Sequence, residues 1–311
     1  MSITAVGTVA YDSISTASGT RNYILGGSAT YFSLASSGFA QTKLVSVVGE
    51  DFQTSDRELF ESHSIDTQDL TVLPGKTFHW KGQYNHVGNA ATIKTDLNVL
   101  QHFNPVLSSS SSTSLYLFLA NIDPDLQLQV LRQMTRRPKL VVGDTMNYWI
   151  ESKSTSLWKV IKKLDVLIIN EEEVRLLTGH QNVIKGSRQI LKQGIPTIII
   201  KKGEHGSIAI NNNSYFAVPA IPLDNVTDPT GAGDSFAGGF LGYTASSMPF
   251  ADLDPEITFK KAMLMGTVMA SLAVEQFGTT GIQKVSREER INRFRMLENM
   301  MQIINLTKGK R

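Results

Sequence analysis

Short apolar segments alternate with helical patterns in the second half of this chain, and this alternation most constrains its fold. Strands are expected at residues 115–119, 140–142, 166–169 and 197–201, and helical patterns follow the first three. The first of these helices has a clear start, because Asp123 suits the N-cap and Pro124 the first turn. Such alternation is typical of a mostly parallel sheet covered by helices on both faces. We therefore expect an α/β fold, which opens with a further strand at residues 3–9.

The predicted strands end in polar and small residues. In an open parallel sheet, ligands bind beyond the carboxyl ends of the strands. The residues expected at such ends are Asp12, Gly26, Gly27, Asp144, Asn170, Glu173, Lys201 and Gly203. Because these ends lie along one edge of the sheet, the sequence predicts a ligand site there.

Residues 228–242 read Asp-Pro-Thr-Gly-Ala-Gly-Asp-Ser-Phe-Ala-Gly-Gly-Phe-Leu-Gly, in which a turn signal is followed directly by a helical pattern. The unpaired N–H groups at a helix start attract anions, and glycines allow a phosphate to approach the backbone closely. Asp234 falls in the first turn, where its carboxylate could accept a hydrogen bond from a substrate hydroxyl. The alternative is that Asp234 is only a favourable first-turn acid and that the glycines only pack the helix.

The charge and residue content of the chain exclude several classes of function. With 30 basic and 28 acidic residues the net charge is +2, which provides no basic field for nucleic acid. The chain has no cysteine, and no apolar run approaches the length of a membrane helix. A Walker lysine after a glycine loop, a G-x-G-x-x-G helix start and a nucleophile elbow are all absent from the sequence. We therefore expect a cytoplasmic protein that binds a small ligand and neither nucleic acid nor membrane.

Residues 77–100 lack a helical pattern. Phe78, Trp80 and Tyr84 are spaced among polar residues, with Gly82 and Gly88 between them. This texture is typical of exposed antiparallel strands joined by turns. We expect these strands to form a flap set apart from the main sheet.

The motif at residues 228–234 resembles the second signature of the ribokinase (phosphofructokinase-B, PfkB) family of carbohydrate kinases, in which Asp-Thr-x-Gly-Ala-Gly-Asp is usual. Matching segments occur in the family's order at residues 7–12, 26–27, 48–51, 170–173 and 201–206. The resemblance covers nearly the whole chain and implies one kinase domain over residues 1–311, with a three-layer α/β/α core, a mostly parallel central sheet and a small β-strand lid. The lid would consist of about residues 12–24 and 75–100, inserted in the core. In many family members, two chains form a homodimer through their lids.

The resemblance also implies how phosphoryl transfer would proceed. Gly231, Ala232 and Gly233 would direct their N–H groups at the migrating phosphoryl group of ATP, as an anion hole. Asp234 would be the catalytic base. We expect the helix dipole to keep Asp234 ionised, so that it orients the acceptor hydroxyl and takes the proton late.

Further residues match the nucleotide and metal positions of the family. Glu173, together with Asn170, would hold Mg²⁺ and the triphosphate through water, whereas a solvated first-turn acid is the alternative for Glu173. In many relatives the residues that match Asp228 and Thr230 help to bind a monovalent cation such as K⁺, but Asp228 equally suits an Asx turn before Pro229. The residues implied at the ATP cleft are Lys201, Gly203, Gly206 and Thr230, where a plain strand–turn–strand over 201–206 is the alternative.

On the acceptor side, Asp12 would accept hydrogen bonds from sugar hydroxyls, and Gly26 and Gly27 would let the sugar approach the backbone. As an alternative, Asp12 is a simple turn residue. The family usually has Asn at the position of Tyr31, and a tyrosine fills volume or stacks on a base instead of offering an amide. This departure leaves room for a nucleoside as the acceptor.

The sequence therefore predicts an ATP- and Mg²⁺-dependent kinase that phosphorylates a hydroxyl of a sugar or sugar-like compound. A nucleoside kinase of the adenosine or inosine type is the alternative within the same family. A non-catalytic ribokinase-like scaffold is the alternative outside enzymes, and the intact residues Gly231 to Asp234 and Glu173 argue against it.

Overall fold

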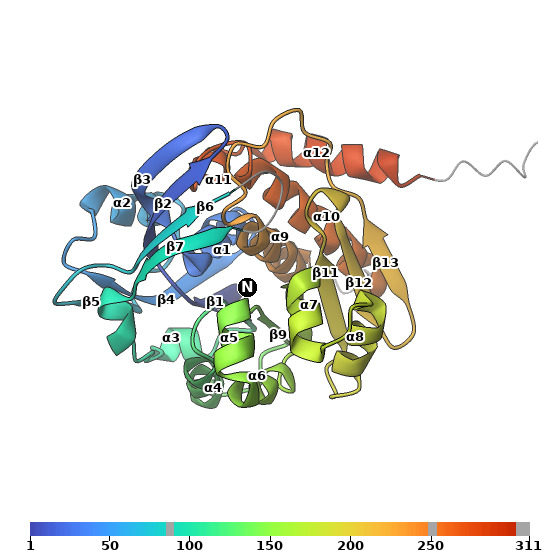
Figure 1. The fold of residues 1–311 in the computed structure, drawn as a ribbon, viewed down its shortest axis with the longest axis horizontal. Helices are drawn as coiled ribbons and strands as arrows, with labels where there is room; N and C mark the ends of the chain where they lie inside the picture. Colours follow the sequence, from blue (N-terminus) through green and yellow to red (C-terminus); the bar gives the residue numbers. More distant parts are fainter. Residues whose placement is uncertain (85–89, 248–253, 303–311) are drawn as a thin grey trace, which may run out of the picture.

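The computed structural model describes residues 1–84, 90–247 and 254–302. These residues form a nine-stranded central sheet and a separate four-stranded small sheet. Figure 1 shows the small sheet, with β2, β3, β6 and β7, at the upper left, and the long helix α12 along the top. None of the helices in the described part of the chain is both long and apolar enough to cross a bilayer.

The central sheet has the order β13-β12-β11-β10-β9-β8-β1-β4-β5. All neighbouring strands from β11 to β5 are parallel, whereas β12 and β13 add antiparallel at one edge. The order reverses between β1 and β8, the kind of position where open α/β sheets bind ligands. The bounds are β1 Ser2–Val6, β4 Gln41–Gly49, β5 Leu70–Leu73, β8 Tyr116–Leu119, β9 Leu140–Gly143, β10 Val166–Asn170, β11 Thr197–Lys201, β12 Ser207–Asn211 and β13 Tyr215–Val218.

Both faces of the central sheet are buried, because its strands alternate apolar side chains between two separate clusters. Strand β10 illustrates this: Ile168 packs into the cluster that contains Phe236 of α9, whereas Leu167 and Ile169 pack into the cluster that contains Val174 of α7. Helices α1, α9 and α10 cover the first face, and α4, α6, α7 and α8 cover the second. The expected three-layer α/β/α arrangement is therefore confirmed.

The helices begin where the sequence supplies capping groups. The predicted start at Asp123 is confirmed, since its side chain accepts a hydrogen bond from the N–H of Asp125 and Pro124 is the first helical residue. The α-helices are α1 Ser28–Ser37, α2 Thr54–Ser62, α3 Ser109–Ser112, α4 Pro124–Gln133, α5 Asn147–Ser152, α6 Ser154–Ile161, α7 Glu171–Thr178, α8 Val183–Leu191, α9 Ala232–Ser247, α10 Pro255–Ala273, α11 Thr280–Gln283 and α12 Arg287–Met300, and two short 3₁₀ helices are η1 Asn98–His102 and η2 Gly203–His205.

The small sheet has the order β3-β2-β6-β7, with bounds β2 Ala10–Thr16, β3 Gly19–Gly26, β6 His79–Gln83 and β7 Ala91–Asp96. Two of its pairs are antiparallel, as expected for the flap, but β2 and β6 are parallel. One expectation was wrong: β1 ends at Val6, so Asp12 lies within β2 of the small sheet and not at the end of the opening strand. The predicted lid range 75–100 extends over residues 85–89, which lie outside the described residues.

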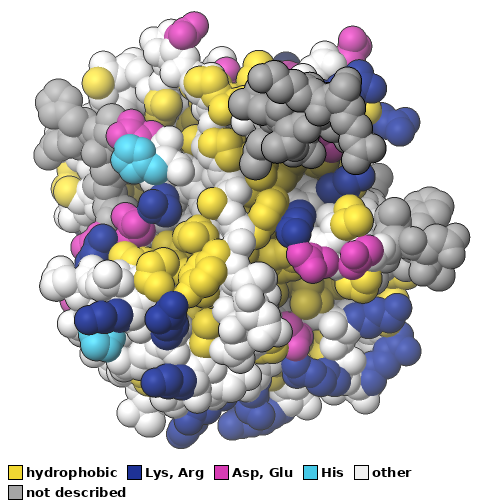
Figure 2. Space-filling model, turned by 90° about the vertical axis from the view of Figure 1, so that its right-hand side faces the viewer, with side chains coloured by type: hydrophobic (Ala, Val, Ile, Leu, Met, Phe, Trp, Pro, Cys, Tyr) yellow, Lys and Arg dark blue, Asp and Glu magenta, His cyan; other side chains and the backbone are white. Residues whose placement is uncertain are grey.

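The charged side chains are unevenly spread although the net charge is only +2. Figure 2 shows one face of the molecule, on which Lys and Arg side chains gather mainly in the lower part. Asp and Glu side chains on the same face lie mostly in its middle and upper parts.

Candidate active site

The residues before α9 form a tight turn that is held from beneath by Asp228. One carboxylate oxygen of Asp228 accepts the N–H of Thr230 at 2.9 Å, and the other accepts the N–H of Gly278 at 2.9 Å. Asp228 is fully buried. Its first contact is an Asx turn, the alternative that the sequence left open for this residue. One oxygen of Asp228 thus fixes the start of the segment that we call the glycine turn, residues 230–233, and the other joins Asp228 to Gly278, which follows α10.

The glycine turn is accessible, and its conformation requires glycine. Gly231 has φ 74°, and a Cβ there would lie 2.3 Å from the ring of Tyr31. Gly231, Ala232, Gly233 and Asp234 are all half-buried, so a ligand can reach the start of α9. The N–H of Ala232 is weakly engaged with the carbonyl of Pro229 at 3.3 Å. The first-turn N–H groups of Gly233 and Asp234 have no carbonyl one turn before them within α9, as at any helix start.

Lys201 brings a positive charge to this helix start. It is the last residue of β11, and it pairs in parallel register with Asn170 at the end of β10. Its Nζ lies 3.7 Å from Oδ2 of the buried Asp144. Burial alone would lower the pKa of Lys201, but the charges of Asp144, Glu173 and Asp234 together raise it above its ordinary value. Lys201 therefore stays charged among three carboxyl groups.

The surroundings of Asp234 raise the pKa of its carboxyl group. Burial raises the pKa of the Asp234 carboxyl well above its ordinary value, repulsion from Asp144 raises it further, and Lys201 only partly opposes this. Our expectation that the helix dipole keeps Asp234 ionised is not supported by this balance. A carboxylate with a raised pKa is, however, a stronger base once it has lost its proton.

Asn170 and Glu173 form a capping box at the start of α7. The Asn170 side chain accepts the N–H of Glu173 at 2.9 Å, and Oε2 of Glu173 accepts the N–H of Asn170 at 2.7 Å. Glu173 is only 6% exposed, so the alternative of a solvated surface acid is wrong. Burial raises its pKa to about 7, although the charge of Lys201 acts in the opposite direction. Among the described residues, no three His, Asp or Glu side chains converge closely enough to hold a metal ion directly.

On the acceptor side, Asp12 packs against Gly26 so closely that a Cβ at position 26 would lie 1.9 Å from its Oδ2. Gly27 has φ 95° and lies directly before α1, and its backbone acts to lower the pKa of the Asp12 carboxyl. Burial, followed by repulsion from Asp228, raises the pKa of Asp12 to about 7. Asp12 is buried at 4% exposure, so the alternative of a simple turn residue is wrong.

Tyr31 lies beneath the glycine turn and not on an open surface. Its side chain is 1% exposed, so its ring offers no face on which a ligand could stack, contrary to that part of our expectation. Its hydroxyl is buried without a hydrogen-bond partner among the described residues. Burial, together with the charges of Asp12 and Asp228, raises the pKa of Tyr31.

The turn after Lys201 is compact. Gly206 has φ 85°, and a Cβ there would lie 2.0 Å from the carbonyl oxygen of Val218, so only glycine fits. Gly203 has φ 57°, and a Cβ built there would meet no other atom of the described residues within 4 Å. The segment links β11 to β12 as a strand–turn–strand, and the nucleotide role of both glycines stays a prediction.

Two residues near the site were not assigned a role from the sequence. Asp144 follows β9, and its position at a strand end was the only signal that could have identified it. Tyr84 follows β6 of the small sheet, and its hydroxyl accepts a hydrogen bond from Oγ1 of Thr230 at 3.0 Å. Only its place among the aromatic residues of the flap pointed to it.

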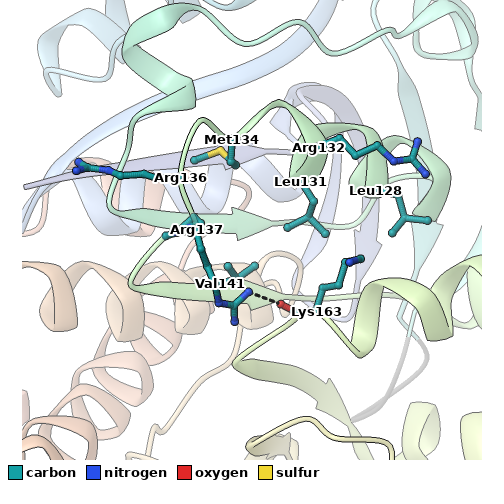
Figure 3. Close-up of a pocket in the computed structure, with 9 residues that line it drawn as sticks. Leu128, Leu131, Arg132, Met134, Arg136, Arg137, Val141 and Lys163 are labelled. Atoms are coloured by element: carbon teal, nitrogen blue, oxygen red, sulfur yellow. Dashed lines mark hydrogen bonds between the residues drawn. The ribbon is translucent and has the colours of Figure 1, made fainter.

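A separate cavity of about 310 Å³ lies where β9 begins, at the N-terminal end of this strand and so away from the predicted site at the C-terminal strand ends. Figure 3 shows Leu131 and Lys163 near its centre, while Arg132 and Arg136 extend away in different directions. Arg137 donates to the backbone carbonyl of Lys163 at 3.3 Å, and to the carboxylate of Asp165 at 2.7 Å. None of the predicted site residues lines this cavity.

Comparison with known proteins identifies relatives along most of the chain. The chain is 26% identical over 250 residues to a cytidine kinase of Thermococcus kodakarensis, which covers 78% of this chain and 89% of that protein. It is 28% identical over 268 residues to a nucleoside kinase of Methanothermobacter thermautotrophicus, which covers 82% of this chain and 79% of that protein. Its fold is similar to that of a Vibrio cholerae fructokinase solved with fructose, ADP and a calcium ion, with a TM-score of 0.77 at 20% identity over 94% of this chain and 98% of that chain.

The family comparison covers the same region as these relatives. Residues 2–285 match the model described as pfkB family carbohydrate kinase. The match includes the glycine turn, Lys201, Asp234 and both sheets. The chain therefore belongs to the PfkB family of carbohydrate kinases and is a phosphotransferase with a ribokinase-like fold.

Proposed function

We propose that this kinase transfers the terminal phosphoryl group of ATP to a sugar hydroxyl of a nucleoside. The observation that carries the transfer is the convergence of the glycine turn, Lys201 and Asp234 at one helix start. The acceptor class is supported by the cytidine kinase and the nucleoside kinase, which resemble this chain over about four fifths of its length. The nucleoside alternative thus takes precedence over the free sugar that the sequence favoured.

ATP and Mg²⁺ fit the charges that surround the glycine turn. Bound ATP supplies the phosphoryl group, and Mg²⁺ neutralises part of its charge. The N–H groups of Gly231 and Gly233 and the ammonium of Lys201 would hold phosphate oxygens. Glu173, with Asn170, would hold Mg²⁺ through water, which suits an ion that keeps much of its hydration shell and a site without three converging acids among the described residues.

Asp234 would act on the acceptor. As the acceptor oxygen forms its bond to phosphorus and the bond to the leaving ADP oxygen breaks, the carboxylate of Asp234 takes the hydroxyl proton. The raised pKa of Asp234 favours this role, because a carboxylate with a higher pKa is a stronger base. Asp12, next to Gly26 and Gly27, would accept hydrogen bonds from the other hydroxyls of the sugar.

Three further predictions stay untested. The K⁺ site at Asp228 and Thr230 is not part of this proposal, because both oxygens of Asp228 already accept backbone N–H groups. The small sheet would act as the lid over the acceptor, inserted in a single kinase domain. A homodimer through the small sheets stays a prediction from the family resemblance.

An acceptor panel tests the proposal. ADP release would be measured with cytidine, inosine and adenosine against ribose and fructose, at one fixed concentration of ATP and Mg²⁺. We expect a kcat/KM at least about 100-fold higher for one nucleoside than for any free sugar. Buried polar and apolar contacts can discriminate between substrates by such a factor. A better free sugar would overturn the nucleoside assignment, and no turnover with any acceptor would favour the scaffold alternative.

Thermal shift provides an independent measurement of acceptor binding. A ligand present at 100 times its Kd stabilises the folded protein by about 2.7 kcal/mol. The same nucleosides and sugars would therefore be ranked by their shift in Tm. Agreement between the two rankings is expected if binding occurs at the catalytic site.

A further inference from the structure

Tyr84 joins the small sheet to the glycine turn. Its N–H donates to the carbonyl of Ser15 in β2 at 2.9 Å, which fixes its backbone to the small sheet. Its hydroxyl accepts the hydroxyl proton of Thr230 at 3.0 Å, directly before Gly231. A second bond joins the small sheet to the segment just before the glycine turn, from Oγ1 of Thr16 in β2 to the carbonyl of Thr227 at 2.8 Å.

The Tyr84 hydroxyl also lies within the field of the acidic side chains of the site. Burial raises the pKa of Tyr84, its hydrogen bond with Thr230 acts in the opposite direction, and the charges of Asp228, Asp12 and Asp234 raise it further. The hydroxyl therefore stays protonated at neutral pH. Because Thr230 donates to it, its own proton is left to be donated to another oxygen.

We propose that Tyr84 is a positioning residue that couples the small sheet to the glycine turn, so that nucleotide and acceptor each favour binding of the other. This inference rests on the proposed function, because it assigns the nucleotide to the glycine turn and the acceptor to Asp12. A ligand that fixes the glycine turn holds Thr230 in place for Tyr84, and Tyr84 then holds β2, the strand of Asp12. Coupling between two binding sites is reciprocal, so the acceptor tightens nucleotide binding by the same factor.

The size of the effect follows from the bond. A hydrogen bond between neutral groups changes an equilibrium by about 2- to 10-fold in a folded protein. We therefore expect removal of the Tyr84 hydroxyl to reduce the coupling between the two ligands by about 5-fold. The bond between Thr16 and Thr227 remains in that variant, so some coupling is retained.

Hydrogen exchange tests the inference without relying on turnover. A non-hydrolysable ATP analogue with Mg²⁺ is expected to slow amide exchange in β2 and β6 of the wild-type protein, although it would bind at the glycine turn. In Tyr84→Phe, which removes one oxygen atom, and in Thr230→Val, the slowing of amide exchange by the analogue should be about 5-fold smaller. Thr230→Ser keeps the hydroxyl and should retain it.

A matched control is Tyr215→Phe. Tyr215 lies on the edge strand β13, on the other side of the molecule from the small sheet (Figure 1), and its hydroxyl accepts a hydrogen bond from Arg188 of α8. In turnover assays, Tyr84→Phe should raise the KM for the acceptor by about 5-fold while kcat changes less. Equal protection of the small sheet in wild type and Tyr84→Phe, or no protection in the wild type, would overturn the inference while leaving the proposed function intact. Failure of the ATP analogue to bind at all would overturn both.

Discussion

The ammonium of Lys201 lies so close to the backbone of Gly233 that a Cβ built at position 233 would be 2.5 Å from Nζ. The two residues come from different elements, the end of β11 and the first turn of α9. Their contact places a fixed positive charge beside the N–H groups at a helix start, and both attract anions. The second glycine of the motif is therefore explained by the space that this lysine needs.

Substitution of that glycine tests the contact. In Gly233→Ala the new methyl group should displace the ammonium of Lys201 from the start of α9, and the KM for ATP is expected to rise by about 10-fold or more, as for loss of one charged hydrogen bond. In the Lys201→Met background the same change should add little. Gly179→Ala serves as control. Its φ is 72°, and no atom of the described residues other than its chain neighbours lies within 4 Å of a Cβ built there, so this variant carries backbone strain without a contact. An unchanged KM in Gly233→Ala would contradict this account.

Replacing Asp234 by Asn keeps the shape of the side chain and removes the carboxylate that we propose as the base. We expect kcat to fall by about 10² to 10⁴, while the affinity for ATP changes only a few-fold. In the wild type, kcat should rise with pH through a midpoint above the ordinary range of an aspartate, because burial and Asp144 raise the pKa of Asp234. Asp224→Asn, at an exposed acid, is the control. A rate that is normal in Asp234→Asn would exclude it as the base.

Much of the fold could be predicted because local patterns decide it. The strand expected at residues 197–201 is β11, with the same bounds, and the helix start at Asp123 is confirmed. The misplacement of Asp12 has a tertiary cause. The chain leaves the central sheet at Gly7, where a Cβ would be 2.5 Å from the Cβ of Ala120. No local pattern in the apolar segment 3–9 marks that contact.

The site was predictable only where a motif carries it. Gly231 to Asp234 are adjacent in sequence, so their joint position at a helix start follows from turn and helix signals. Tyr84 and Thr230 are 146 positions apart, and their bond depends on how the small sheet meets α9. The capping box of Asn170 and Glu173 has the required spacing, yet the burial of Glu173 follows only from the packing of α7 on the sheet.

Glu173 caps α7 and has a proposed role toward Mg²⁺, and substitution can separate the two. Glu173→Gln keeps an oxygen for the N–H of Asn170 but removes the charge, whereas Glu173→Ala removes both and should also cost about 1 kcal/mol of stability as a lost cap. In both variants the Mg²⁺ concentration for half-maximal activity is expected to rise by about 10-fold, as for groups that act on a metal through water. Glu171→Gln, in the first turn of the same helix, is the control. A normal Mg²⁺ response in Glu173→Gln would mean that the residue serves only as a cap.

Asp12, a residue of the proposed acceptor site, also affects the pH dependence of stability. Burial, and then repulsion from Asp228, raises its pKa from 3.8 to about 7 in the folded protein. The folded state therefore holds this proton more tightly than the unfolded state does. By linkage, the free energy of unfolding decreases as the pH rises from about 4 to about 7, and it is constant with respect to this group above that range.

Asp12→Asn is consequently expected to make the protein more stable at pH 8 and to leave it nearly unchanged at pH 4. The raised pKa corresponds to about 4 kcal/mol at pH 8, since each unit is worth about 1.4 kcal/mol. Denaturant unfolding of both proteins at several pH values measures the difference directly. Titrating groups distant from Asp12 contribute equally to the two, whereas Asp234, whose pKa the charge of Asp12 raises, has a smaller pKa rise in the variant. The same variant should bind the acceptor more weakly. Burial of the Asp12 carboxylate costs stability, and we expect the protein to keep this residue because its oxygens accept hydrogen bonds from the hydroxyl groups of the acceptor. A stability difference that does not vary with pH would show that Asp12 is not held in a desolvated, charge-crowded position.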